Sequence, residues 1–140
     1  MTDFITFEQG HESAADSPWG FQRVCVSTDG QLEYEHRSRA GKRIVRGTVD
    51  GERVKALRRE FSRTSFPQKP QETFQPGASI IRLTTTPPTY SVLIDYFDGM
   101  QMDGYREIIR DLSELNNALR EDNHEALSKW RFERAPEVAT

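Results

Sequence analysis

The stretch WGFQRVCVSTDGQLEYEHRSR, residues 19–39, decides the class of fold. Two runs rich in aromatic and β-branched residues lie on either side of Asp29-Gly30. Asp-Gly between such runs is a strong signal for a β-hairpin, because glycine adopts the positive φ that a tight turn demands. The sequence therefore predicts two antiparallel strands, at residues 19–27 and 31–39.

Apolar and charged side chains alternate within the second of these strands. Leu32 and Tyr34 fall on one face, and Glu33 and Glu35 fall on the other. Such alternation is typical of an antiparallel sheet with one face in the core and one face in water. We therefore expect the charged face to be solvated.

Strand and helix patterns extend in both directions from the hairpin. Further strands are predicted at residues 4–8, 43–48, 80–86 and 90–97, and helices at residues 50–63 and 103–121. The last strand carries apolar residues on both faces, which favours a central place in the sheet. The predicted class is α+β: an antiparallel sheet of about six strands with two main helices packed on one face, in the order ββββαββα.

Both helices show an apolar stripe at helical spacing. Asp50 is the expected N-cap of the first helix, whose stripe begins with Val54 and Leu57. After the expected cap Asp103, the stripe of the second helix comprises Tyr105, Ile108, Ile109, Leu112, Leu115 and Leu119. This is the strongest helical pattern in the chain, so its middle residue, Leu112, is expected in the core.

Length and composition indicate one globular domain. The chain has 140 residues, of which 35% are hydrophobic and 29% are charged, and this is enough apolar material for a core. The domain is expected to span residues 1–134, with a frayed tail at residues 135–140. Cys25 is the single cysteine, and neither a signal peptide nor a membrane-spanning run is recognised. We expect a cytoplasmic protein of bacterial type.

Positive charge gathers in one segment, residues 37–63. This segment contains ten Lys or Arg residues and three acidic residues, for a net charge of +7, whereas the whole chain carries −3. Basic surfaces bind phosphate backbones by counterion release, so a nucleic-acid-binding accessory protein is one alternative. The rest of the chain is acidic and would repel a polyanion, so nucleic acid is not the expected partner. Instead, Arg58 and Arg59 are expected to steer an acidic protein partner.

No catalytic or metal-binding motif is present. The sequence lacks H-E-x-x-H, P-loop, G-x-G-x-x-G, G-x-S-x-G and C-x-x-C patterns. The histidines His11, His36 and His124 are dispersed, whereas a zinc site needs three or four ligands brought together. We expect no metal, no cofactor and no enzymatic activity.

Cys25 and Asp95 keep an enzymatic alternative open. Cys25 and His36 lie on the two strands of the hairpin, but symmetric pairing about the turn offsets them in the ladder. A lone cysteine on a strand is more typical of a small hydrophobic residue than of a nucleophile, so we expect Cys25 to be structural. Asp95 lies within an apolar strand and has no local structural explanation.

A Pro/Gln-rich segment at residues 67–77 is the expected recognition loop. Its three prolines restrict the backbone, and a stiff loop loses little entropy when it binds. Phe74 is an aromatic residue in polar surroundings, with Gln71 and Glu72 as neighbours. These three residues are the predicted contacts with a protein partner. The alternative is that Phe74 folds back as a plug over the sheet edge.

The order of the segments also suggests a family. A first strand and a hairpin are followed by the basic helix ERVKALRREF (residues 52–61), Phe66-Pro67, Pro76-Gly77-Ala78, two strands, Phe97-Asp98-Gly99 and a terminal helix. This layout, over residues 4–119, resembles the emfourin family, which comprises small bacterial inhibitors of thermolysin-like metalloproteases such as protealysin. The chain has additional residues in its first loop, in the Pro/Gln-rich loop and at its C-terminus. The resemblance implies a similar fold and a protein-binding role, and it assigns no inhibitory residue to a position in this chain.

The predicted function is a noncatalytic protein-binding module, with protease inhibition as its most specific form. A toxin-neutralising immunity-type protein is an alternative that the sequence does not separate from a protease inhibitor. The sequence also leaves open a nucleic-acid-binding accessory protein and an enzyme that uses Cys25 or Asp95.

Overall fold

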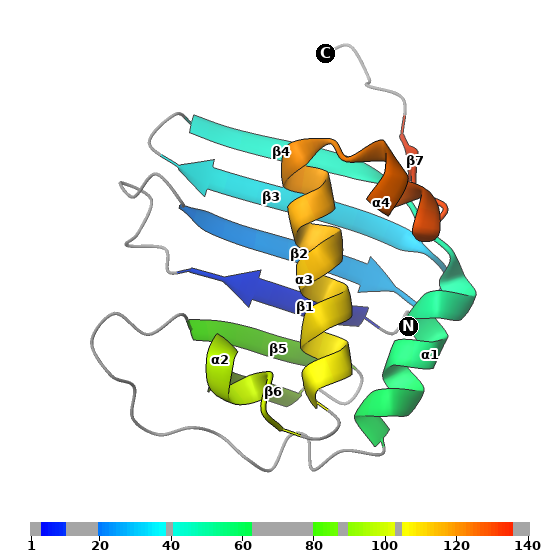
Figure 1. Ribbon diagram of the computed structural model, residues 1–140. Helices are drawn as coiled ribbons and strands as arrows, with labels where there is room; N and C mark the ends of the chain where they lie inside the picture. Colours follow the sequence, from blue (N-terminus) through cyan, green and yellow to red (C-terminus); the bar gives the residue numbers. More distant parts are fainter. Residues whose placement is uncertain are drawn as a thin grey trace.

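The computed structural model describes residues 4–10, 20–38, 41–62, 80–86, 90–102 and 105–135. Its strands are β1 (Phe4–Gln9), β2 (Phe21–Ser27), β3 (Gln31–Ser38), β4 (Gly41–Thr48), β5 (Ile80–Thr86), β6 (Tyr90–Asp95) and β7 (Glu133–Arg134). Its helices are α1 (Gly51–Ser62), α2 (Tyr96–Gly99), α3 (Tyr105–Glu121) and α4 (His124–Lys129). The class is the predicted one, α+β with an antiparallel sheet (Figure 1).

Neighbouring strands of the sheet are antiparallel, and their order is β6-β5-β1-β2-β3-β4-β7. The N-terminal strand β1 is central, because it pairs with both β2 and β5. After β4, the chain passes through α1 and returns on the other side of β1 as β5. Figure 1 shows α1 and α3 over one face of this sheet.

The predicted hairpin is confirmed. Gly30 has a φ of 91° and donates its N–H to the carbonyl of Ser27 at 3.0 Å. Val26 pairs with Leu32 on either side of this turn. Glycine is required at the turn because this φ lies in the left-handed region that other residues rarely adopt.

One hydrophobic core lies between the helices and the inner face of the sheet. The predicted stripe of α3 is confirmed as buried, since no side chain in it is more than 1% exposed. Its partners from the sheet include Ile5, Phe7, Val24, Val26, Tyr34, Ile81, Leu83, Val92 and Ile94. Val54 and Leu57 add the apolar side of α1 to the same core. The stripe of α3 is therefore the centre of the helix layer.

The start of α1 is fixed by contacts with the C-terminal part of the chain. The Asp50 carboxylate accepts the backbone N–H of Glu52 at 3.1 Å, as expected for an N-cap. The N–H of Asp50 itself donates to the carbonyl of Trp130 at 2.8 Å. The Arg53 guanidinium lies 4.3 Å from the centre of the Trp130 ring and donates to the Lys129 carbonyl at 2.6 Å. These contacts join the end of α4 to α1. The other expected cap, Asp103, lies outside the described residues.

Three polar side chains form a cluster inside the core that the sequence pattern did not indicate. The amide oxygen of Gln22 accepts hydrogen bonds from the Tyr34 hydroxyl at 3.2 Å and from the Asn116 amide at 3.0 Å. All three side chains are buried. The cluster ties α3 to β2 and β3, because each residue comes from a different element.

Because of Tyr34, the stability of the protein is expected to fall at alkaline pH. Burial raises the pKa of Tyr34 from 10.0 to about 12, although Arg120 and Arg43 act in the opposite direction. Between these two pH values, only the unfolded chain loses the phenolic proton, so stability falls as the pH rises. Tyr34→Phe removes this proton. The stability advantage of the native protein over the variant should shrink by roughly 2–3 kcal/mol across that range, measured by urea unfolding. If the free energies of unfolding of the two proteins change in parallel with pH, the raised pKa of Tyr34 is contradicted.

Two predictions for residues 90–97 are wrong. β6 ends at Asp95, and Tyr96–Gly99 forms the short helix α2. β6 also lies at an edge of the sheet, with β5 as its only strand partner among the described residues. Its inner face is apolar because helices cover it, as shown by Gly99, which lies against Ile94 and Ile109.

The sheet has a seventh strand, β7, that the sequence did not predict. β7 has two residues, and among the described residues it pairs only with Gly47 and Thr48 of β4. A side chain at position 47 would overlap the Glu133 carbonyl and the Phe132 ring, so the glycine permits this close approach. Beyond β7, residues 136–140 of the expected tail lie outside the described part. Within the described ranges, no helix is long and apolar enough to cross a membrane.

Candidate functional site

The candidate site lies on the open face, by which we mean the face of the sheet opposite α1 and α3. Side chains alternate between faces along each strand, so those next to a core residue point to the open face. The strand registers place Thr6 opposite Cys25, Cys25 opposite Glu33, and Glu33 opposite Arg46. One row of side chains therefore crosses four strands, from β1 to β4.

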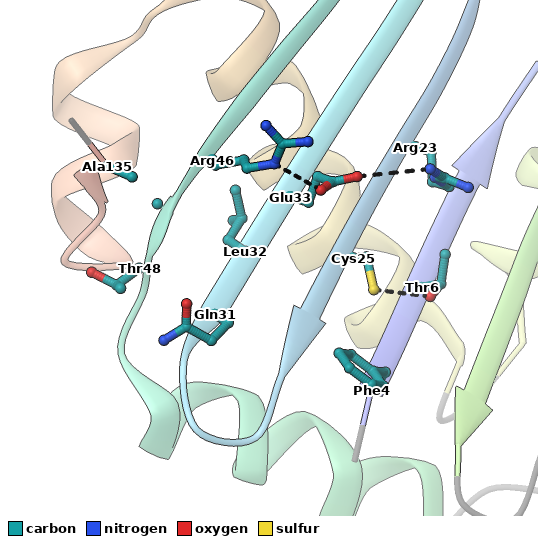
Figure 2. Close-up of a pocket in the computed structure, with 11 residues that line it drawn as sticks. Phe4, Thr6, Arg23, Cys25, Gln31, Leu32, Glu33, Arg46, Thr48 and Ala135 are labelled. Carbon is teal, nitrogen blue, oxygen red and sulfur yellow. Dashed lines mark hydrogen bonds and ion pairs between the residues drawn. The ribbon is translucent and has the colours of Figure 1, made fainter. Parts of the chain in front are cut away.

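This row passes through a hollow of about 570 Å³. The hollow is lined by Phe4, Thr6, Arg23, Cys25, Gln31, Leu32, Glu33, Arg46, Gly47, Thr48 and Ala135. Figure 2 shows Phe4, Thr6 and Cys25 near one another, with Glu33 and Arg46 farther along the row and Arg23 beside it. Phe4 is 39% exposed, so it offers apolar surface at the edge of the hollow. The hollow thus has an apolar part and a charged part.

In the charged part, one carboxylate lies between two guanidinium groups. Glu33 contacts Arg46 at 3.0 Å and Arg23 at 3.9 Å through its two oxygens. The group has a surplus of one positive charge. Exposed ion pairs add little to stability, so these arginines can change partner at small energetic cost. The charged part is therefore suited to contact with a carboxylate of another molecule.

A second group with one positive charge in surplus lies beside the hollow. Glu35 contacts Arg37 at 2.8 Å and Lys42 at 3.4 Å. The expectation that Glu35 is solvated is wrong, since only 4% of the residue is exposed. Burial opposes ionisation of this carboxyl, but the hydrogen bond and charge of Arg37, together with Arg23 and Lys42, outweigh it and lower its pKa.

The predicted contact residues are only in part described. Arg58 donates hydrogen bonds to the carbonyls of Phe4 at 3.3 Å and Thr86 at 3.2 Å, so it holds the ends of β1 and β5. Arg59 lies on α1 with its side chain exposed. The other three predicted residues, Gln71, Glu72 and Phe74, lie outside the described residues.

The described residues of the basic segment do not form one surface. Arg43 binds the carbonyls of Leu119 and Arg120, both at 3.2 Å, at the end of α3. Arg53 binds α4, and Arg58 binds the ends of two strands, as described above. The charge is thus divided between the helix layer and the open face, which the linear sequence could not show.

Cys25 and His36 do not face each other across the hairpin. Cys25 is half-buried in the hollow, where it accepts a hydrogen bond from the Thr6 hydroxyl at 3.4 Å. His36 pairs with Gln22, so the predicted offset from Cys25 is confirmed. Asp95 is the last residue of β6, and its side chain lies outside the described part. In the described ranges, no three His, Cys, Asp or Glu side chains are grouped so as to hold a metal ion.

Cys25→Ser is expected to leave folding and partner binding nearly unchanged. The serine hydroxyl keeps the hydrogen-bond contact with Thr6, and we assign no chemistry to the thiol. Binding within threefold of the native protein, with a similar melting temperature, is the expected result. Loss of function in a folded variant that still binds its partner would favour the enzymatic alternative.

No family model matches the chain, and no curated protein matches it either.

Proposed function

We propose that this protein is a noncatalytic protein-binding module that engages its partner with the open face. The observation that carries the proposal is the hollow, with exposed Phe4 at one end and the group formed by Arg23, Glu33 and Arg46 at the other. An apolar patch bordered by charged groups that remain in water is the usual composition of a transient protein interface.

The shape of the site also favours a macromolecular partner. The hollow lies on the face of a sheet and is open toward solvent, so a bound small molecule would keep part of its surface in water. A side chain that projects from a second protein fills such a depression while the surrounding residues contact the rest of the interface. Exposed Ile44 on β4 extends the apolar surface beyond the hollow.

Inhibition of a thermolysin-type metalloprotease in the bacterial cytoplasm is the narrower form of this proposal. Its support is the layout of segments that resembles emfourin, together with an α+β fold. Neutralisation of a toxin would use the same kind of surface, so the identity of the captured partner distinguishes the two.

The test compares two variants that each introduce one arginine. Thr6→Arg places a long side chain in the hollow, whereas Asn117→Arg places it on α3, on the opposite side of the molecule. Immobilised native protein and both variants are used to capture partners from an extract of the native host. We expect Thr6→Arg to lose at least tenfold in capture and Asn117→Arg to lose little. Equal capture by a folded Thr6→Arg would overturn the proposal.

The narrower form is tested with thermolysin and a peptide substrate. The native protein and Asn117→Arg are expected to inhibit peptide cleavage, and Thr6→Arg is expected to inhibit at least tenfold less. If the protein captures a partner but does not inhibit the protease, the proposal of a protein-binding module stands and the proposal of protease inhibition is overturned.

A further inference from the structure

We infer that the edge of β4 between Gly41 and Arg46 binds an extended segment of the partner, with a glutamate opposite Ile44. The inference rests on the proposed function, since it names the part of the protein partner that the open face recognises. It adds a backbone contact to a proposal that otherwise depends on side chains alone.

The first observation is that β7 covers one end of β4 only. β7 pairs with Gly47 and Thr48, and the next residue, Ala135, donates its N–H to the Arg46 carbonyl at 2.8 Å. From Gly41 to Val45, no described strand lies on that side of β4. Figure 1 shows β4 at the outer edge of the sheet with β7 beside one end.

The second observation gives the direction of the backbone groups. In an antiparallel sheet, the N–H and C=O of one residue face one neighbouring strand, and those of the next residue face the other. The Arg46 carbonyl faces β7, and β4 pairs with β3 in continuous register. The backbone groups of Ile44 and Lys42 therefore also point away from β3. They are in place to extend the sheet by one strand.

The third observation is the chemistry of the side chains along this edge. The side chains of Lys42 and Arg46 are 55% and 64% exposed, and Ile44 between them is 39% exposed. Edge lysines commonly protect a sheet from unwanted pairing. An exposed isoleucine between two cations instead favours pairing with an acidic strand. The edge thus offers one apolar contact with a positive group on each side.

Charge complementarity specifies the occupant. Glu35 is shared by Lys42 and Arg37, and Glu33 is shared by Arg46 and Arg23, so each carboxylate serves two cations. A partner residue directly opposite Ile44 has Lys42 and Arg46 as its diagonal neighbours on the same face, within reach of a long side chain. A glutamate at that place would contact both cations, whereas a lysine would be repelled by both.

The probe is an acetylated and amidated nonapeptide that alternates Thr and Val around one central Glu. Its affinity is measured by NMR titration of the full chain, with the Lys42 and Ile44 amides as reporters. Replacement of the Glu by Lys should weaken binding at least tenfold. N-methylation of the Glu nitrogen and of the nitrogens two residues away should abolish binding, because these N–H groups would face β4. N-methylation of the intervening nitrogens should leave binding within threefold.

Ile44→Pro is the matched change in the protein. Proline at position 44 removes an N–H that points to the free edge and no hydrogen bond to β3, so it is tolerated at an edge strand. We expect the peptide and the captured partner to bind at least tenfold more weakly to Ile44→Pro. Ile44→Val, which keeps the N–H and a branched apolar side chain, should weaken binding at least threefold less than the proline does. If the proline variant does not fold, the two N-methylated peptides decide the question.

The outcomes separate this inference from the proposal on which it rests. Unchanged partner binding by folded Ile44→Pro, with a loss for Thr6→Arg, would overturn the edge inference and leave the hollow as the interface. Unchanged binding by both variants would overturn both. Two results would show that this chain itself occupies the edge, and either would overturn the inference. One is a dimer that Ile44→Pro dissociates. The other is a tenfold gain in peptide affinity when residues 136–140 are removed.

Discussion

Trp130→Ala is expected to lower the free energy of unfolding by roughly 3–5 kcal/mol, the usual range for removal of a buried aromatic side chain. Only 2% of Trp130 is exposed, and its ring lies beneath the Arg53 guanidinium. Its loss would create a cavity at the point where α4 meets the start of α1. The measurement is urea unfolding followed by circular dichroism.

A more conservative change provides the control for this prediction. Trp130→Phe keeps an aromatic face beneath Arg53 and fills part of the same space, so we expect it to lose about half as much stability or less. A loss below about 1 kcal/mol for Trp130→Ala would mean that the end of α4 is not held to α1 as the structure shows.

Leu112→Ala is expected to cost about 2–5 kcal/mol, from the lost burial of the side chain and the cavity left behind. Leu112 is 0% exposed and lies in the middle of the buried stripe of α3. Glu114, on the same helix, has an exposed side chain, so Glu114→Ala should change stability by no more than about 0.5 kcal/mol. Equal effects of the two substitutions would contradict the orientation of α3.

Local patterns were sufficient to predict the hairpin and the main helix. Asp29-Gly30 is itself the turn signal, and the helix around Leu112 has one apolar face that can be buried. In both cases the interacting residues are close in sequence. Prediction from the sequence succeeded there because the physical cause and its effect lie in the same short segment.

The order of strands could not be predicted in this way. The pairing of β1 with β5 joins residues that are 72 to 82 positions apart, and no turn between them fixes the register. β6 was misplaced because its apolar inner face reflects cover by α2 and α3 and not strands on both sides. β7 was missed because two residues carry no periodicity.

The candidate site is non-local for the same reason. Thr6, Cys25, Glu33 and Arg46 come from four strands, and each is ordinary in its own segment. Only the register brings them into one row. A sequence signal did exist, because each lies at an alternate position next to a core residue, but its use requires the strand pairing to be known.

The rate at which Cys25 reacts with a thiol reagent in the presence of the partner tests the binding role of the open face most directly. Cys25 lines the hollow and is the single cysteine of the chain, so mass spectrometry of this chain reports one site. Binding at the open face predicts that saturating partner slows labelling at least tenfold. An unchanged rate, with the partner shown to be bound, would contradict the account and move the interface to another surface.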